Sequence, residues 1–390
     1  MRIMSEINAS NFKKEHGDLA PDLVGVTELT SPYFFVPPSG TTAERPSDCE
    51  PGTLRFNTDI GSLEVFRGKT IGWEQIQRRD SQYLGGGTGS NTGTGTRVIQ
   101  GGGQNPSNSN NQIQFFTLST LGNAQDFGDL LDNGRSSRGA ASSSTRGLFG
   151  NFSNTNMINF VTIASLGNAQ DFGDYTYTGS YKSGLSNQTR AIFAGGRDNP
   201  ATYKDDIHYV TISQTGNTVD FGNLEAGNPF LATLASTTRG IIAGGYRTPG
   251  ARTNTIQFVT ISTLGNSVDF GDCVAPVYAA AGASNATRGI ISGGDAQGVG
   301  KTNTIQFVTI STLGNAIDFG DSTNKVHIAA GGASPTRAAF FGGYTGTGSP
   351  NTTNEINFVE IATTGNATDF GDLLSAMMYS TGFSNGHGGL

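Results

Sequence analysis

The sequence has little charge, few cysteines and no long apolar run. Charged residues make up 14% of the 390 residues and the net charge is −7 with no basic stripe, so we expect no nucleic-acid binding. Cys49 and Cys273 lie far apart, which argues against a disulfide scaffold or a cysteine zinc site. No stretch of 18 apolar residues occurs and the first residues lack a secretory apolar core, so we expect no membrane insertion.

Glycine is abundant instead, at 57 residues, and one phrase recurs. The tripeptide Asp-Phe-Gly begins at six positions, with spacings of 45, 49, 49, 49 and 51: Asp126, Asp171, Asp220, Asp269, Asp318 and Asp369. Protein kinases use this tripeptide once, to hold magnesium, and their companion motifs are absent here. Repetition favours an architectural role, in which each Asp caps a turn or pairs with an arginine and each Phe fills space between repeats.

Each repeat predicts four short strands. One strand starts at an arginine followed by apolar residues: Arg97, Arg146, Arg190, Arg239, Arg288 and Arg337. The next is apolar on both faces and starts with isoleucine: Ile113, Ile158, Ile207, Ile256, Ile305 and Ile356. A Gly-Asn pair then predicts a tight hairpin into the Asp-Phe-Gly strand. A segment of Ala, Gly and Ser, as in residues 278–289, predicts a crowded innermost strand.

Four strands per unit of about 49 residues predict an all-β fold, a six-bladed β-propeller over residues 97–390. Residues 377–390 match the innermost strand and then stop, whereas the first copy lacks this strand. We therefore expect the C-terminal strand to complete the first blade, because closure removes exposed sheet edges.

The repeat, with its arginine strand ending in Gly-Gly, resembles the kelch repeat, although Asp-Phe-Gly stands where Tyr and Trp are usual. The resemblance implies a kelch-like propeller, a fold commonly used for binding. Its galactose-oxidase branch carries a copper site of Tyr and His. Here His208, His327 and His387 show no recurring pairing with Tyr, so we expect no metal, no cofactor and no enzyme activity.

Length varies between repeats only after the paired glycines. Such insertions map to one face of a repeat array, which is often the binding face. The candidate binding residues on or beside these loops are Tyr203, Lys204, Asp205, Asp206, His208, Tyr246, Arg247, Arg252, Lys301 and Tyr344. Tolerated drift in surface loops is the alternative interpretation.

Residues 1–83 differ in composition and precede a Gly/Thr/Ser linker at 84–96. Residues 31–52 are Pro-rich, and 52–76 predict a small β-meander of three strands with Trp73 as its core. That stretch resembles a module of tail fibres and other virion proteins of tailed phages. The matching residues are Gly52, Leu54, Arg55, Phe56, Asn57, Thr58, Asp59, Leu63, Glu64, Val65, Phe66, Gly68 and Trp73. The Asp-Phe-Gly-Asp repeat is similar to repeats in structural proteins of phages that infect marine cyanobacteria.

The two resemblances together imply a virion structural protein, a tail-fibre or appendage component assembled in the host cytoplasm. Residues 1–83 would bind other virion proteins, and the propeller would bind a glycan or protein of the host surface. Such fibres are usually symmetric homo-oligomers, and a trimer is favoured. Two alternatives stay open: a capsid or collar decoration protein without a ligand, and a propeller enzyme that acts on polysaccharide.

Overall fold

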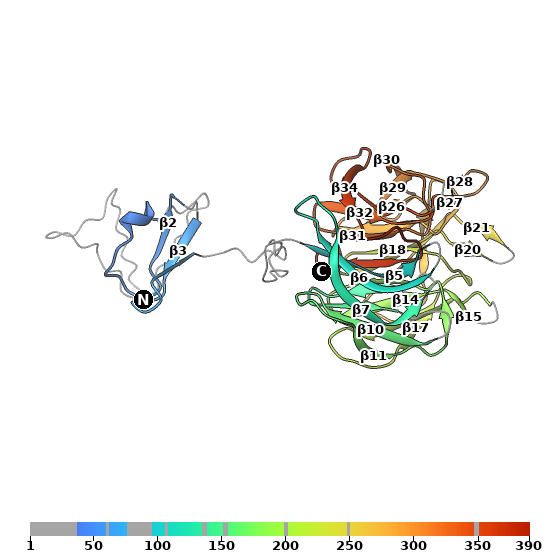
Figure 1. Ribbon diagram of the computed structural model, residues 1–390, viewed down its shortest axis with the longest axis horizontal. Helices are drawn as coiled ribbons and strands as arrows, with labels where there is room; N and C mark the ends of the chain where they lie inside the picture. The colour runs from blue at the N-terminus through green and yellow to red at the C-terminus, as the bar shows by residue number, and fades with distance from the viewer. Residues whose placement is uncertain are drawn as a thin grey trace, which may run out of the picture. The chain divides into compact units, whose positions relative to one another are not determined.

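The computed structural model describes residues 37–59, 62–75, 96–105, 108–134, 139–150, 155–198, 202–247, 250–346 and 351–390. The chain divides into two compact units, Met1–Arg78 and Arg79–Leu390, which are treated separately below. Within the described ranges the fold is all-β, with mostly antiparallel sheets and no α-helix (Figure 1). Residues 1–36 of the predicted attachment region and the predicted linker at 84–96, apart from Thr96, lie outside the described residues.

The smaller unit is one four-stranded sheet in the order β1-β2-β3-β4. Its elements are β1 (Ser39–Gly40), the 3-10 helix η1 (Thr42–Glu44), β2 (Leu54–Asn57), β3 (Ser62–Phe66) and β4 (Trp73–Gln75). Strands β2, β3 and β4 pair antiparallel and correspond to the predicted meander. Strand β1 adds to β2 in parallel.

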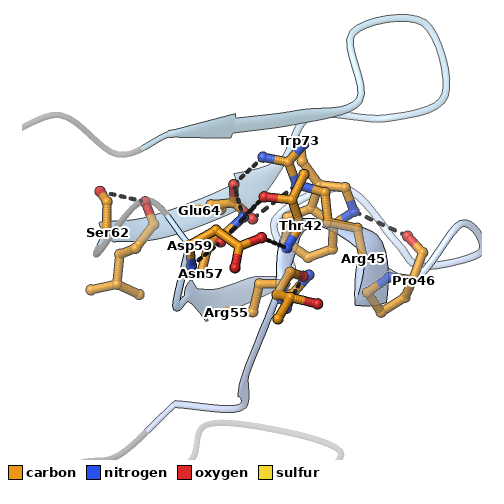
Figure 2. A network of polar contacts seen from close by, with 11 residues as sticks. Thr42, Arg45, Pro46, Arg55, Asn57, Asp59, Ser62, Glu64 and Trp73 are labelled. Carbon is orange, nitrogen blue, oxygen red and sulfur yellow. Dashed lines mark hydrogen bonds and ion pairs between the residues drawn. The ribbon is translucent and has the colours of Figure 1, made fainter.

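The prediction that Trp73 forms the core of this meander is wrong. Trp73 is partly exposed, packs on the buried Phe66 at 5.5 Å between ring centres, and donates its indole N–H to Pro46 O at 3.0 Å. The fully buried side chains are instead polar: Glu64 accepts from the Asn57 amide at 2.9 Å and from the Arg45 guanidinium (Figure 2). The hydrogen bond from Arg45 lowers the pKa of Glu64, so this carboxylate stays charged at neutral pH.

The larger unit contains six four-stranded antiparallel sheets, each built from an innermost, an arginine, an isoleucine and an Asp-Phe-Gly strand in that order. The first is β35 (Thr381–Ser384), β5 (Arg97–Gln104), β6 (Ser109–Thr117) and β7 (Gln125–Gly134). The second is β8 (Ala140–Ser142), β9 (Arg146–Phe149), β10 (Met157–Thr162) and β11 (Gln170–Asp174). The third is β13 (Ser183–Ser186), β14 (Arg190–Ala194), β16 (Asp206–Thr211) and β17 (Val219–Asn223).

The remaining three sheets repeat the same order. The fourth is β18 (Ala232–Ala235), β19 (Arg239–Ala243), β22 (Thr255–Thr260) and β23 (Val268–Asp272). The fifth is β25 (Ala281–Ser284), β26 (Arg288–Ser292), β29 (Thr304–Thr309) and β30 (Ile317–Asp321). The sixth is β31 (Ala330–Ala333), β32 (Arg337–Phe341), β33 (Glu355–Glu360) and β34 (Thr368–Asp372). The predicted strand content of each repeat is therefore confirmed.

The sheets contact one another in a closed sequence. Each innermost strand touches the innermost strand of the next sheet, and the sixth, β31, touches β35 of the first. The predicted pairing of the C-terminal strand is also present, with Thr381 opposite Gly101 and Ser384 opposite Val98. The first sheet is thus assembled from two segments at opposite ends of the larger unit's sequence.

The Gly-Asn pairs join neighbouring sheets rather than form two-residue hairpins, which corrects the prediction. Seven residues separate β22 from β23, and within them Gly265 N donates to Phe221 O of the preceding sheet at 2.8 Å. The side-chain oxygen of Asn266 accepts from Asn223 N at 3.0 Å. Both bonds recur at all six boundaries, including Gly122 and Asn123 against the last sheet.

The arginines also bridge sheets, so their predicted pairing with the motif aspartates is wrong. Arg239 stacks on Phe258 of its own sheet, 4.5 Å from the ring centre, and donates to Ile310 O of the next sheet at 2.7 Å. The equivalent arginines do the same, and Arg337 closes the sequence at Leu118 O. The first Asp of each motif is exposed, whereas its Phe is buried between sheets as predicted.

The glycine of each Asp-Phe-Gly motif lies against the backbone of the next Gly-Asn loop and leaves no room for a side chain. Substitution by alanine tests this close approach. Gly320 has φ +148°, and a Cβ there would lie 2.4 Å from Gly365 O. Gly314 has φ +151° but nothing within 4 Å of its Cβ position. Because backbone strain is matched, we expect Gly320→Ala to destabilise the unit by at least about 2 kcal/mol more than Gly314→Ala in denaturant unfolding. Equal effects would show that the close approach contributes nothing.

Removal of residues 377–390 tests the closure. The truncated chain would lose β35, so β5 would keep only β6 as a paired strand and β31 would lose its innermost neighbour on one side. Unpaired edges lose hydrogen bonds and invite association, so we expect a much lower thermal midpoint and aggregation. An unchanged unfolding curve would contradict the role of this strand.

Candidate functional site

The variable loops lie beside the connections that lead into the next sheet. Gly245 N donates to Val277 O and Gly294 N donates to Val326 O, each at 2.8 Å. Small sheets of two or three strands extend from this end of the larger sheets: β12 (Gly179–Ser180) with β15 (Arg197–Asp198), β20 (Tyr246–Arg247) with β21 (Ala251–Arg252), and β24 (Val277–Tyr278) with β27 (Asp295–Ala296) and β28 (Gly300–Lys301). Side chains from successive sheets therefore meet on these loops.

Aromatic side chains form a continuous belt across four successive sheets. The belt consists of Tyr203, Tyr246, Tyr278, His327 and Tyr344. Neighbouring ring centres are 6.2, 5.3, 6.0 and 5.2 Å apart in that order. The four tyrosines are partly exposed. His327 is buried, and burial lowers its pKa to about 4, so its ring is neutral at pH 7.

Charged side chains along the belt are mostly paired. Lys204 bonds Asp198 at 3.0 Å, and Arg247 bonds Glu225 at 2.9 Å. Arg252 bonds Asp295 at 2.5 Å and lies 5.3 Å from the centre of the Tyr278 ring.

Lys301 lies 5.1 Å from the centre of the Tyr344 ring. The belt thus presents tyrosine faces beside polar groups whose charges largely cancel.

A second set of residues, the inner rim, precedes the innermost strands. Its five members occupy equivalent repeat positions and all have φ between 57° and 62°: Tyr181, Phe230, Ala279, Ile328 and Tyr379. This left-handed conformation costs a non-glycine residue about 1–2 kcal/mol, and it is rarest for a β-branched residue such as Ile328. Glycine would relieve the strain, so the retained side chains point to a role beyond architecture.

The inner rim is held by its own backbone and is joined to the belt. Phe230, Ala279 and Ile328 each donate their N–H to the carbonyl of the preceding member, at 3.4, 2.9 and 2.8 Å. These three residues line a cavity of about 90 Å³ between the innermost strands. Phe230 also lies 5.6 Å from Tyr278 and 4.1 Å from Tyr181, so belt and rim make one aromatic surface.

Around the loop at 202–209 lies a third group, the Lys182 cluster. It comprises Tyr175, Tyr177, Lys182, Asp198, Lys204, Asp206 and His208. Lys182 is 3% exposed, and its Nζ has no hydrogen-bond partner. The Nζ is 4.0 Å from the centre of the Tyr177 ring and 4.8 Å from that of Tyr175. Burial lowers the pKa of Lys182 to about 7, against the opposing effect of Asp206 and Asp198.

His208 departs from the repeat. The equivalent position in the other five sheets is Gln or Asn: Gln114, Asn159, Gln257, Gln306 and Asn357. Four of those amides accept a backbone N–H from a neighbouring sheet, as Gln257 does from Glu225 N at 2.9 Å. His208 instead lies 3.1 Å from the Thr176 hydroxyl, and burial lowers its pKa, so the buried ring is neutral at pH 7.

The ten predicted binding residues fall into different places. Tyr203, Tyr246 and Tyr344 lie in the belt, with Arg247, Arg252 and Lys301 beside it. Lys204, Asp206 and His208 belong to the Lys182 cluster, and Asp205 uses its backbone carbonyl to accept from Leu224 N.

Sequence reasoning missed the remaining belt residues, the inner rim and the lysine itself: Tyr278, His327, Tyr181, Phe230, Ala279, Ile328, Tyr379 and Lys182. Alignment of the six repeats would have indicated them, because large or charged residues stand there just before the strand of small residues.

Comparison with known protein families and with curated proteins finds no match. In the described part of the chain, no group of three His, Cys, Asp or Glu side chains is placed to hold a metal ion. The same part has no helix of the length and apolarity needed to cross a membrane.

The titration of Lys182 predicts a pH-dependent stability. Its pKa is lower in the folded chain than in the unfolded chain, so the unfolded state binds more protons between pH 7 and 10.5. Burial of the protonated Lys182 amine therefore lowers the free energy of unfolding by its full amount below pH 7. This destabilisation disappears as the pH rises towards 10.5. We expect Lys182→Leu, which copies Leu231, to raise the free energy of unfolding at pH 7 by roughly 2–4 kcal/mol and to remove this rise with pH.

The matched control for this measurement is Lys204→Leu. Lys204 bonds Asp198, and this hydrogen bond raises its pKa, so its removal should leave stability equal or slightly lower. A Lys182→Leu variant that is less stable than the unaltered chain at pH 7 would contradict the cost assigned to the buried amine.

Proposed function

We propose that this chain is a phage virion structural protein, a tail-fibre or other appendage component that binds the host surface. In this proposal the smaller unit attaches to other virion proteins. The larger unit is a six-bladed kelch-like β-propeller that recognises a glycan or protein of the host. The single observation that carries the binding role is the aromatic surface made by the belt and the inner rim.

The closed sequence of sheet contacts supports the propeller. Each boundary has the same three hydrogen bonds. The glycine of the Gly-Asn pair donates its backbone N–H to the neighbouring sheet, the asparagine side chain accepts a backbone N–H from that sheet, and the arginine donates to a backbone carbonyl of the next sheet. A sixfold closed order of four-stranded antiparallel sheets is the arrangement that a propeller requires.

Glycan binding fits the aromatic surface. Partly exposed tyrosine rings offer flat apolar faces on which the C–H face of a pyranose can pack, and each phenol adds a hydrogen-bonding group. The ion pairs of Arg247 with Glu225 and Arg252 with Asp295 place further polar groups at the edge of the belt. The strain retained at Phe230 and Ile328 is consistent with selection for side chains at the rim rather than for stability.

Attachment through the smaller unit is supported by its reversed sheet faces. Arg55, Asn57 and Glu64 point to the buried face. Alternation puts Leu54 and Leu63 on the other face, where they are 45% and 38% exposed. An apolar sheet face that stays exposed suits a protein partner, either another virion protein or further copies in a homotrimer.

The test separates the two surfaces in the full-length chain. Tyr246→Ala with Tyr278→Ala should weaken binding to host cells and to immobilised host polysaccharide at least about tenfold, while incorporation into particles stays unchanged. Leu54→Glu with Leu63→Glu should instead lower incorporation into particles and leave binding to host cells and to host polysaccharide unchanged.

The control for both variants is Leu264→Ser, which alters a 58% exposed side chain on a Gly-Asn loop and should change neither measurement. Full host binding by the tyrosine variant would reject the belt as the recognition surface.

A further inference from the structure

One boundary between neighbouring sheets departs from the repeat at buried positions. Lys182 stands where four of the other copies have Leu231, Ala280, Ala329 and Ser380, and the fifth has Arg138, which lies outside the described residues. At the position of Tyr175 the other copies have Leu130, Leu224, Cys273, Ser322 and Leu373. Four of the other boundaries therefore close without a charged group or a phenol at these two positions, so the fold does not need the amine and the phenol here.

The surrounding backbone packs closely against the lysine. Both the Lys182 Nζ and the Tyr175 hydroxyl are buried without a hydrogen-bond partner. A Cβ on Gly196 would lie 2.8 Å from Lys182 Cγ, and one on Gly179 would lie 3.2 Å from the Nζ. The partly exposed Tyr177 ring stands 4.0 Å from the Nζ and is the neighbour that solvent can reach.

Burial of the amine favours its neutral form. The titratable groups that face it are Asp198, Asp206, Lys204 and His208, together with the two tyrosines. Desolvation exceeds the effect of the two carboxylates and lowers the pKa of Lys182 to about 7. At neutral pH a large share of the amine therefore keeps its lone pair, which is the reactive form. The two carboxylates also disfavour a bound anion, so a neutral electrophile is the ligand that suits this amine.

We propose that Lys182 is a nucleophilic amine that captures a small aldehyde as a Schiff base. The Nζ lone pair forms a bond to the carbonyl carbon, which gives a carbinolamine. The carbonyl oxygen then leaves as water with the two amine protons, and a carbon–nitrogen double bond remains. The apolar walls provided by Tyr175 and Tyr177 favour this loss of water. No oxidant or metal is needed, and the proposal is independent of the virion role.

The experiment treats the full-length folded chain with glycolaldehyde and cyanoborohydride at pH 7 and maps the reduced adduct by peptide mass spectrometry. An ordinary lysine near pKa 10.4 is about a thousandfold less deprotonated at this pH than one near 7. We expect Lys182 to be labelled at least about a hundredfold faster than the partly exposed Lys301. Its rate should level off above pH 7, whereas that of an ordinary lysine continues to rise towards pH 10.

Two variants separate reactivity from simple burial. Lys204→Arg removes the other amine beside Tyr177 and should leave the labelling of Lys182 unchanged. Tyr177→Ala opens the solvent side and should speed the labelling severalfold. The proposal is overturned if Lys182 is labelled no faster than Lys301 in the folded chain and in the folded Tyr177→Ala variant. Labelling that appears only after unfolding in urea would overturn it equally.

Discussion

The larger unit depends on hydrogen bonds between neighbouring sheets that repeat around a closed sequence. At each boundary a Gly-Asn loop reaches back to the Asp-Phe-Gly strand of the preceding sheet, and an arginine reaches forward to the next. The motif glycine must approach a backbone carbonyl too closely for any side chain. Since six boundaries share this geometry, these residues are held nearly constant, and the variation in length lies in the loops after the paired glycines.

Within so regular a frame, departures from the repeat carry the information about function. The belt and the inner rim place tyrosines and Phe230 where small or polar residues would satisfy the fold. Lys182 is a stronger departure from the repeat than the belt or the inner rim, because a buried amine without a hydrogen-bond partner lowers the stability of the fold at neutral pH. The two features lie on neighbouring loops but differ in kind: one is a partly exposed aromatic surface, and the other is a buried amine.

The smaller unit reverses the usual distribution of polar and apolar residues. Glu64 and Asn57 are buried, and Glu64 accepts hydrogen bonds from Asn57 and Arg45 (Figure 2). Leu54 and Leu63 are exposed instead. In a sheet this small, a connected polar network can fix the register of the strands, and the apolar face is then free to bind a partner. Asn57, Asp59 and Glu64 take part in this network.

The sequence by itself determined the six repeats, their four strands and the pairing of residues 381–384 with the arginine strand at 97. Periodicity and strand patterns are local properties, and the complementary ends left one way to complete the first sheet. Three assignments needed the tertiary structure: Gly265-Asn266 as a bridge between sheets, Arg239 as a partner of a carbonyl, and Trp73 as a partly exposed residue.

The same holds for the candidate sites. Tyr203 and Tyr246 could be chosen from loop composition, but Tyr278, Phe230 and Lys182 could not. Their neighbours come from adjacent repeats, and a repeat pattern states how each unit is built without stating which atoms of the next unit it meets. Only the packing of one sheet against another decides which side chains become a shared surface and which amine is shut away from water.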